Sequence, residues 1–576
     1  MHDLDNPAVP LSRRTLIRRI GWGSAAILAS ASVVVARNRE DDAASASRAG
    51  STPEDDDALL ARIVSGSEPF IPRRETSYRL TRTVPIAGGK TVLIEPGTRI
   101  VWAGPVEMAG GNRPVAVFEA MGDNVTLAAA SDGEAFIQCQ TPSVWVYAAV
   151  MEGRSGFRVE GIAAHNCQHV WVNTSARDYG AVRTQGPGSN IARDVRVSGG
   201  GASFESLQVS GNGACLLSYV AGAHVSDVHY ENAVHGIQWW GGDSGLLDWQ
   251  NGMRANERKC SDLLIERVSV RNAGIGGIWG SMGREITVRD CQVEECHDVG
   301  FDPEGCDDVT FERCTSRNGH NGCFAAFFLN DGIRFVDCHG IVDDKAWPLF
   351  RTYNVTQSNA ENRNIAVEGG HFECLDPTGP GTMDCASGPV RELAITGARL
   401  ENVRIDTFFL NMHRTRIADN ELVFPRPLPS VPAIRAGGSQ SLPGAVGSAV
   451  VENNRIRYTA PRAAAAAAAA AGESVAIEIV ENDFNASATS TVSGNIVSGP
   501  FAVGIALVNA SGNAGVVPAF EVSGNRFEGL APSARLLSVR QQTDQAQAPT
   551  VRWDDAQTRD GRAVGRAQAL GESRLP

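Results

Sequence analysis

The chain has 576 residues, a formal net charge of −13 and an apolar fraction of 43%. This length allows several ordinary domains or one long repetitive domain, and the apolar fraction is sufficient for a continuous core. The acidic balance excludes a general nucleic-acid binder, because no basic excess is available to neutralise phosphates. Aromatic residues make up only 6% of the chain while it contains 61 Gly, a mixture that favours short strands joined by tight turns.

The N-terminus carries an export pattern. Residues 12–18, SRRTLIR, follow the twin-arginine signature, and a weakly apolar stretch follows over residues 20–36. The stretch is short for a membrane span, so we expect residues 1–36 to be a cleaved signal peptide, with no stable membrane span after cleavage. An uncleaved anchor is the alternative. The predicted location is periplasmic or extracellular, and the charged, Ala- and Ser-rich residues 37–70 are predicted to be a linker.

A short repeat organises the middle of the chain. Residues 286–291 (ITVRDC), 309–314 (VTFERC) and 333–338 (IRFVDC) alternate apolar and polar positions and end on Cys, and residues 263–268 are the same unit ending on Val. The steps from 268 to 291, 314 and 338 are 23, 23 and 24 residues. Later units have Asn at the fourth position, where we expect it to adopt the left-handed turn conformation. These units span residues 417–422, 451–456, 479–484, 492–497 and 522–527.

A repeat of this length built from short strands indicates a solenoid. We predict an all-β fold, a right-handed parallel β-helix over residues 71–535, whose coils stack about 4.8 Å apart. Two interruptions are expected, an inserted loop at residues 241–260 and a polyalanine run at 463–471. Residues 536–576, rich in Gln, Arg, Asp and Ala, are predicted to be a flexible tail.

Twelve cysteines in an exported protein invite a disulfide prediction. Cys374 and Cys385 bracket a loop rich in Pro and Gly and form the best candidate pair. Cys291, Cys314 and Cys338 recur inside the repeat and are expected to be small buried apolar residues.

The stretch over residues 299–306, VGFDPEGC, stands at the centre of the repeat. Residues two apart on a strand share a face, so Asp302 and Glu304 are expected to project together while Phe301 points inward. Carrying this register across coils gives an inward ladder of Ile237, Ile278, Phe301, Phe324 and Phe350. It also gives a first outward column of Gln238, Trp279, Asp302, Ala325 and Arg351, and a second of Trp240, Ser281, Glu304, Phe327 and Tyr353.

This wall has aromatic ends and a charged middle, which favours a groove for sugar rings. We predict five catalytic residues: Asp302, Glu304, Arg351, His320 and Tyr353. We predict six substrate-binding residues: Trp239, Trp240, Asp243, Trp279, His297 and Phe327. No cofactor is required, although Asp302 and Glu304 offer the oxygen ligands that Ca²⁺ prefers.

Residues 75–530 resemble the pectate-lyase-like superfamily of right-handed β-helices. Within them, the 299–304 motif and the following NGHNGCF at 318–324 resemble the catalytic region of mannuronan C5-epimerases. That resemblance implies an active-site role for Asp302. Val299 and Glu304 stand where the family motif has Tyr and His.

Two chemistries suit such a wall. A lyase or C5-epimerase acting on an acidic polysaccharide would use Arg351 to neutralise the substrate carboxylate or to abstract the proton, and Tyr353 or His320 to donate a proton. Asp302 and Glu304 would hold Ca²⁺ in this mechanism. An inverting glycoside hydrolase would use Asp302 and Glu304 as its carboxyl pair, with Asp243 or Asp307 as substitutes. A non-catalytic protein that binds glycans or supports the cell envelope is the third alternative.

Overall fold

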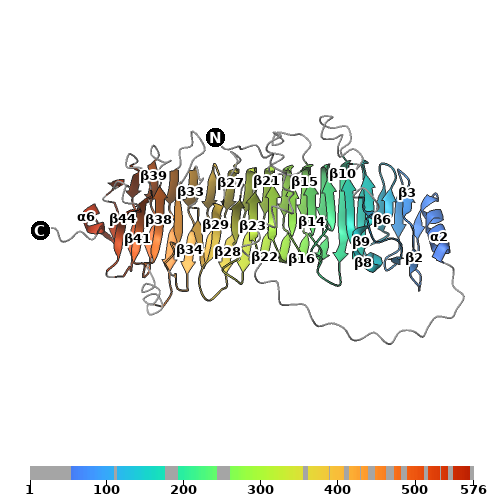
Figure 1. Cartoon of the computed structure of the whole chain (residues 1–576), viewed down its shortest axis with the longest axis horizontal. Helices are drawn as coiled ribbons and strands as arrows, with labels where there is room; N and C mark the ends of the chain where they lie inside the picture. Colours follow the sequence, from blue (N-terminus) through green and yellow to red (C-terminus); the bar gives the residue numbers. More distant parts are fainter. Residues whose placement is uncertain are drawn as a thin grey trace, which may run out of the picture. The chain divides into compact units, whose positions relative to one another are not determined.

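The computed structural model describes residues 53–108, 113–174, 192–242, 260–353, 361–387, 390–407, 414–428, 430–438, 448–461, 473–481, 489–510, 517–531, 533–542, 549–554 and 556–570. Each strand of a coil pairs in parallel with the equivalent strand of the next coil, usually three strands further along the chain. The chain therefore winds through three rows of strands, which Figure 1 shows lying side by side along the coils. The predicted right-handed parallel β-helix is confirmed.

The three rows are called A, B and C. Row A contains β1 (Phe70–Ile71), β4 (Thr91–Ile94), β7 (Thr126–Ala129), the first parts of β9 (Arg158–Asn173) and β10 (Ala192–Ser203), β12 (Val220–Ser226), β15 (Cys260–Glu266), β18 (Gly283–Arg289), β21 (Asp307–Glu312), β24 (Asp331–Val336), β27 (Arg363–Glu368), β30 (Leu393–Thr396), β33 (Arg414–Ala418), β36 (Ser448–Glu452), β39 (Thr489–Ser493), β42 (Ala519–Ser523) and β45 (Thr550–Trp553).

Row B contains β2 (Tyr78–Leu80), β5 (Arg99–Trp102), the first part of β8 (Ala135–Glu152), the middle of β9, the end of β10, β13 (His229–Glu231), β16 (Ser269–Ala273), β19 (Gln292–Cys296), β22 (Thr315–Gly319), β25 (His339–Val342), β28 (His371–Cys374), β31 (Arg399–Glu401), β34 (Glu421–Phe424), β37 (Arg455–Tyr458), β40 (Ile496–Ser498), β43 (Arg526–Glu528) and β46 (Thr558–Arg559).

Row C contains β3 (Val84–Ile86), β6 (Val115–Ala120), the ends of β8 and β9, β11 (Cys215–Ser218), β14 (Ile237–Trp240), β17 (Ile278–Ser281), β20 (Val299–Glu304), β23 (Gly322–Phe327), β26 (Phe350–Tyr353), β29 (Gly381–Ser387), β32 (Val403–Asp406), β35 (Ile434–Gly438), β38 (Val475–Glu481), β41 (Val503–Asn509) and β44 (Arg535–Gln541). The short β47 (Arg562–Ala563) pairs antiparallel with β46.

The core lies inside the coils and is built from stacked ladders of identical or similar side chains. In row A, Phe311 stacks on Phe335 with ring centroids 5.0 Å apart, and in row C, Phe301 stacks on Phe324 at 5.2 Å. Phe301 also meets Phe311 edge-on at 5.8 Å, so the two ladders interlock. All four rings are fully buried. Equal side chains at equal positions therefore pack the interior from one coil to the next.

The corner between rows A and B explains the Asn-containing units, and the predicted backbone role of Asn was wrong there. The left-handed residue is the one before each Asn; for example, Asn453 has φ 55° and precedes Asn454, and Gly494 has φ 65° and precedes Asn495. Asn454 itself is buried, and its Oδ1 accepts hydrogen bonds from the backbone N and the Nδ2 of Asn420. The Asn side chains form a hydrogen-bonded ladder along the coils. The unit at 479–484 differs from the others, because Ile479 lies in β38 of row C.

Both ends of the β-helix extend beyond the predicted limits. The predicted linker at 37–70 is too long, because residues 53–65 form helix α2 (Pro53–Ser65), which packs against β1, β2 and β3. Leu60 and Val64 of α2 join the main core. Asp56 and Asp57 accept hydrogen bonds from the backbone N atoms of Arg79 and Thr81, both at 2.9 Å. The helix thereby covers the apolar end of the first coils.

The predicted flexible tail at 536–576 is also corrected. Strands β44, β45 and β46 continue the three rows past residue 535, and helix α6 (Arg566–Ala569) follows. Trp553 donates its indole N–H to the carbonyl of Val564 at 3.0 Å, and Val564 and Ala569 are buried in the core. The polar composition of this segment is compatible with order because only its inward positions need to be apolar.

The predicted disulfide is absent. Cys374 and Cys385 are both buried free thiols, like the other ten cysteines of the chain. Cys374 ends β28 in row B and Cys385 lies in β29 in row C, so each fills its own place inside the coil. The expectation that Cys291, Cys314 and Cys338 are small buried residues is confirmed.

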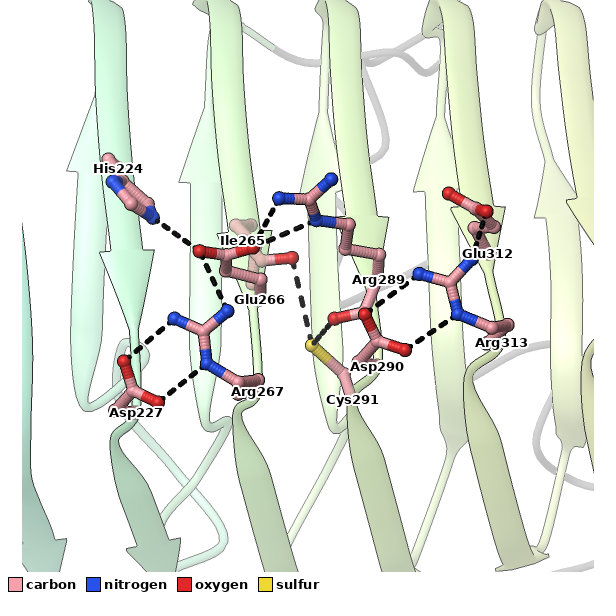
Figure 2. Close-up of polar contacts among 10 residues, drawn as sticks. All are labelled: His224, Asp227, Ile265, Glu266, Arg267, Arg289, Asp290, Cys291, Glu312 and Arg313. Carbon is pink, nitrogen blue, oxygen red and sulfur yellow. Dashed lines mark hydrogen bonds and ion pairs between the residues drawn. The ribbon is translucent and has the colours of Figure 1, made fainter.

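An ion-pair network stands on the outer side of row A and its corner with row B (Figure 2). Glu266, only 5% exposed, accepts hydrogen bonds from Arg289 at 2.6 and 2.8 Å and contacts His224 at 3.0 Å. Arg267 contacts Glu266 at 2.9 Å and pairs with Asp227 at 2.7 Å. These ion pairs and hydrogen bonds link side chains of three successive coils.

Replacing Glu266 with Gln is expected to lower the free energy of unfolding by about 2 kcal/mol, because the half-exposed guanidinium groups of Arg267 and Arg289 lose a buried shared carboxylate. Chemical denaturation of the variant and the unmodified protein at low and high salt measures this. High salt should reduce the difference in the free energy of unfolding between the two proteins, because it screens the ion pairs. A variant as stable as the unmodified protein at low salt would show that the network contributes nothing.

Three predictions fall outside the described residues: the signal peptide at 1–36, the polyalanine run at 463–471, and Asp243 with most of the 241–260 loop. Across the described ranges, no helix has the length and apolar character needed to cross a membrane.

Candidate functional site

The register predicted for row C is confirmed. Gln238 pairs with Trp279, and Trp279 pairs with Asp302. In the second column, Ser281 pairs with Glu304, and Glu304 pairs with Phe327. Figure 1 shows β14 and β23 in the row to which these columns belong. The structure therefore brings Asp302, Glu304, Trp240, Trp279, Phe327, Arg351 and Tyr353 onto one face.

The exposure expected for this face was wrong. Trp279 is 3% exposed and Phe327 is 7% exposed, so neither is an open platform for a sugar ring in this structure. Trp239 is corrected more strongly, because strand alternation places it in the main core with no exposed surface. A side chain in place of Gly280 would meet the Trp239 ring at 2.1 Å, so the next coil leaves room for this inward indole. Trp240, Arg351 and Tyr353 are partly exposed.

Asp302 and Glu304 form a buried carboxylate pair on β20. Asp302 is 2% exposed and Glu304 is 6% exposed. The Ser281 hydroxyl of the preceding coil donates a hydrogen bond to Glu304 Oε2 at 2.9 Å. Asp302 and Glu304 thus place two buried acids on one strand face, and their catalytic roles stay predictions.

Aromatic side chains border the pair on its N-terminal side. Trp279 lies between His235, stacked at 5.1 Å, and Trp240, tilted at 6.0 Å between ring centroids. His235 is buried, and its Nδ1 accepts a hydrogen bond from the backbone N of Gly276 at 3.0 Å. The neutral ring therefore carries its proton on Nε2. Of these rings, Trp240 is the one with substantial exposed surface for contact with a ligand.

Arg351 borders the pair on the C-terminal side, two coils from Asp302 and thus about 10 Å away along the stack. Its Nη1 donates to Oδ1 of Asn321, whose Nδ2 donates to Asp298 Oδ1 at 2.8 Å. Its Nε lies 3.5 Å from Asp384 Oδ2 of the next coil. These partners hold the guanidinium in place on the face.

Tyr353 ends the second column and contacts two rings edge-on. Its ring centroid lies 5.8 Å from Phe327 and 5.5 Å from Phe328. Burial raises the pKa of Tyr353, and the nearby charge of Arg351 opposes that shift only in part. The hydroxyl therefore stays protonated at neutral pH and is available as a proton donor.

His297 and His320 do not join the carboxylate pair. They lie at the corner between rows B and C, where His320 is stacked between His297 at 5.1 Å and Trp347 at 4.2 Å. Backbone hydrogen bonds from His297 to Ala273 and from His320 to Cys296 fix this corner. The geometry gives the two rings a stacking role beside the site, and their predicted roles in catalysis and binding stay predictions.

This stack makes the protein acid-sensitive. Burial, and then the nearby His297, lower the pKa of His320, while Glu295 and Asp344 act in the opposite direction. The unfolded chain takes up this proton near pH 6.5 and the folded chain resists it, so the unfolded state binds more protons below that pH. We expect stability to fall between pH 7 and pH 5, and to fall less steeply in His320→Gln. Denaturation midpoints at several pH values measure this, and equal slopes would contradict it.

The Ca²⁺ site predicted at Asp302 and Glu304 stays a prediction. Ca²⁺ takes six to eight oxygen ligands. Within the described ranges, no three His, Cys, Asp or Glu side chains are arranged to hold a metal ion.

Three residues of this face were not singled out as site residues from the sequence: His235, Asn321 and Asp384. The repeat offered a signal for His235, because His235 stands two residues before Ile237 just as Val299 stands two residues before Phe301. His235 therefore occupies the position in its coil that Val299 occupies beside the acids. Asn321 lies inside the NGHNGCF motif but was not given a role. Asp384 falls next to Arg351 only through the register of β26 and β29, which contains an irregularity.

The fold and this face define a right-handed parallel β-helix protein with a carboxylate pair on its third row. Residues 195–342 match the family model described as "Right handed beta helix region". No protein with a curated description matches the sequence significantly.

Several solved structures are similar to the chain at low sequence identity and low TM-score. The A-module of Azotobacter vinelandii mannuronan C-5 epimerase AlgE4 is 16% identical over 81% of this chain and 91% of its own, with a TM-score of 0.31. The catalytic domain of an alpha-1,3-glucanase is 10% identical over 83% and 69%, with a TM-score of 0.31. A tailspike protein of E. coli bacteriophage HK620 is 10% identical over 80% and 73%, with a TM-score of 0.37.

Proposed function

We propose that the chain is an exported polysaccharide-modifying enzyme that acts on an acidic glycan by lyase or C5-epimerase-like chemistry on the outer face of row C. The buried carboxylate pair of Asp302 and Glu304 carries the proposal. The support comes from the side chains of this chain and not from the similar solved structures. The twin-arginine pattern at 12–18 supports a periplasmic or extracellular location.

Each role follows from position and charge. Arg351, held by Asn321 and flanked by Asp384, would neutralise the carboxylate of a uronic acid residue. Asp302 would accept the proton from the carbon next to that carboxylate. The electron pair left on carbon spreads into the carboxylate, where the guanidinium stabilises it.

Two outcomes complete the reaction. If a proton returns from the opposite face, the sugar is epimerised. If the bond to the glycosidic oxygen breaks instead, the electron pair forms a carbon–carbon double bond and the Tyr353 hydroxyl would protonate the leaving oxygen. The Tyr353 phenol is in its acid form at neutral pH, as this donor role requires. Trp240 would contact a neighbouring sugar ring of the polymer.

Inverting hydrolysis is the second candidate, and the spacing of the acids favours it. Asp302 and Glu304 are two residues apart on one strand, a rise of about 6.6 Å. Carboxyl groups about 6.5–9.5 Å apart leave room for the attacking water of an inverting hydrolase. One acid would protonate the leaving oxygen while the other accepts a proton from water.

Incubating the purified protein with a panel of acidic and neutral polysaccharides distinguishes these functions. Products that absorb in the ultraviolet indicate a lyase, a changed ratio of uronic acids without cleavage indicates an epimerase, and new reducing ends without absorbance indicate a hydrolase. Binding without any chemical change would replace the proposal with a glycan-binding or envelope protein.

A further inference from the structure

All twelve cysteines of the chain lie in the described ranges, and all are buried free thiols. Eleven are at most 1% exposed and Cys291 is 2% exposed, so they are core residues rather than surface groups. They are distributed from β8 in the early coils to β29 in the later ones. Small proteins of oxidising compartments use cysteines in disulfides, so twelve unbridged thiols in a chain with an export pattern need an explanation.

In the folded protein the thiols donate hydrogen bonds to backbone carbonyls. Cys291, Cys314 and Cys338 occupy the same corner position in three successive coils. Cys314 and Cys338 donate their S–H toward a carbonyl of the preceding coil, that of Val288 at 3.4 Å and that of Phe311 at 3.5 Å. The Cys291 thiol lies 3.2 Å from the Arg289 carbonyl of its own coil and 3.7 Å from the Ile265 carbonyl of the preceding coil. Cys260 donates in the same way to Leu217 at 3.4 Å, and Cys323 donates to Ile341 at 3.4 Å.

Oxidation would remove this arrangement. A disulfide between two ladder cysteines takes both thiol hydrogens and two electrons to an oxidant and forms the S–S bond. The carbonyls of Val288 and Phe311 would then lose their thiol donors inside the core, and the third cysteine of the ladder would remain unpaired. The folded state therefore depends on the thiol form and not on cross-links.

The folded protein also protects its thiols. The thiolate is the form that attacks oxidants and disulfides. Burial raises the pKa of Cys260 and of Cys323 to about 11, and that of Cys215 to about 12. Once folded, these groups are both inaccessible and protonated at physiological pH.

The unfolded chain has no such protection. Twelve cysteines allow on the order of 10⁴ complete pairings, and none of them is the native state. We propose that this chain folds with all twelve thiols reduced before it meets an oxidising compartment, and that it is exported already folded. The twin-arginine pattern at 12–18 fits, because that route carries folded proteins whereas the general secretory route carries unfolded ones.

Counting the free thiols tests whether the chain folds with all twelve thiols reduced. The full chain is expressed with its own N-terminus, recovered from outside the cytoplasm, and alkylated before and after denaturation. We expect no labelling of the native protein and twelve labels per chain after denaturation without reductant. A disulfide in the folded protein, or retention of the chain in the cytoplasm, would overturn the proposal.

Exchanging the signal peptide tests whether the chain must be exported already folded. Residues 1–36 are replaced by a leader that directs unfolded chains to the general secretory route. We expect loss of folded protein and recovery of disulfide-linked species, with folding restored in a host that lacks the periplasmic thiol oxidase. Folded protein with twelve free thiols from this route in an oxidising host would contradict the proposal.

A matched variant separates oxidation from slow folding. Cys291, Cys314 and Cys338 are replaced together by Val, the residue at 268 that takes the same position in the preceding coil. This variant should fold through the native route and show fewer mixed disulfides through the exchanged one. An unchanged pattern of disulfides would show that the ladder does not cause the failure.

Discussion

Replacing Asp302 with Asn is expected to lower the rate of polysaccharide modification by about 10²- to 10⁴-fold. The carboxylate is nearly isosteric with the amide, so the buried space on β20 stays filled. The amide cannot accept the proton that the reaction releases, and kcat should fall more than KM rises. Initial rates on the substrate identified from the panel measure the effect.

Two companion variants sharpen this result. Glu304→Gln changes the second acid of the pair, and Glu294→Gln changes an exposed acid on β19 in row B, away from the site. The first should lose activity while the second should keep it, with all three proteins sharing the same unfolding midpoint. Full activity in Asp302→Asn would remove the carboxylate pair from the mechanism, whatever the substrate.

Replacing Asn454 with Ala is expected to lower the free energy of unfolding by about 3–5 kcal/mol. The side chain is fully buried in the ladder between rows A and B. Its Oδ1 accepts from the N and Nδ2 of Asn420, and its Nδ2 donates to Ile417 O and Asn495 Oδ1 at 2.9 Å. Alanine removes these four buried hydrogen bonds, at about 1 kcal/mol each. Asn420 Nδ2 still donates to Ile395 O, and Asn495 Oδ1 still accepts from the backbone N of residue 454.

The neighbouring residue provides the control. Asn453 is exposed and has φ 55°, a conformation that Gly adopts without strain. Asn453→Gly should change stability by less than about 0.5 kcal/mol. Urea denaturation of both variants measures the difference, and equal stability of the two would show that the ladder is not a stabilising element.

Much of the fold could be predicted because its period is written in the sequence. The ITVRDC, VTFERC and IRFVDC units fix the coil length near 23 residues, and strand alternation fixes which side chains point inward. The same register placed Asp302, Glu304, Arg351 and Tyr353 on one face. It also places Trp239 inward between the outward Gln238 and Trp240, so including Trp239 among the binding residues conflicted with the alternation.

The errors share one cause: they depend on what lies against a residue. Local preference suggested that Asn454 adopts the left-handed backbone conformation. In the structure its side-chain amide hydrogen-bonds with Asn420 and Asn495, and Asn453 is the residue with the left-handed conformation. Polar composition suggested disorder at both ends, but α2 and the last coils bury the few apolar side chains that they possess.

The sequence alone determined the coil period, the row that carries the acids and the order of residues along it, because these follow from repetition and alternation. Only the tertiary structure decided that Asp302, Glu304 and Trp279 are buried, that Asn321 and Asp384 hold Arg351, and that Cys374 and Cys385 remain separate thiols. Burial and pairing are relations between coils, and neighbouring coils bring together residues that the chain keeps 20 or more positions apart.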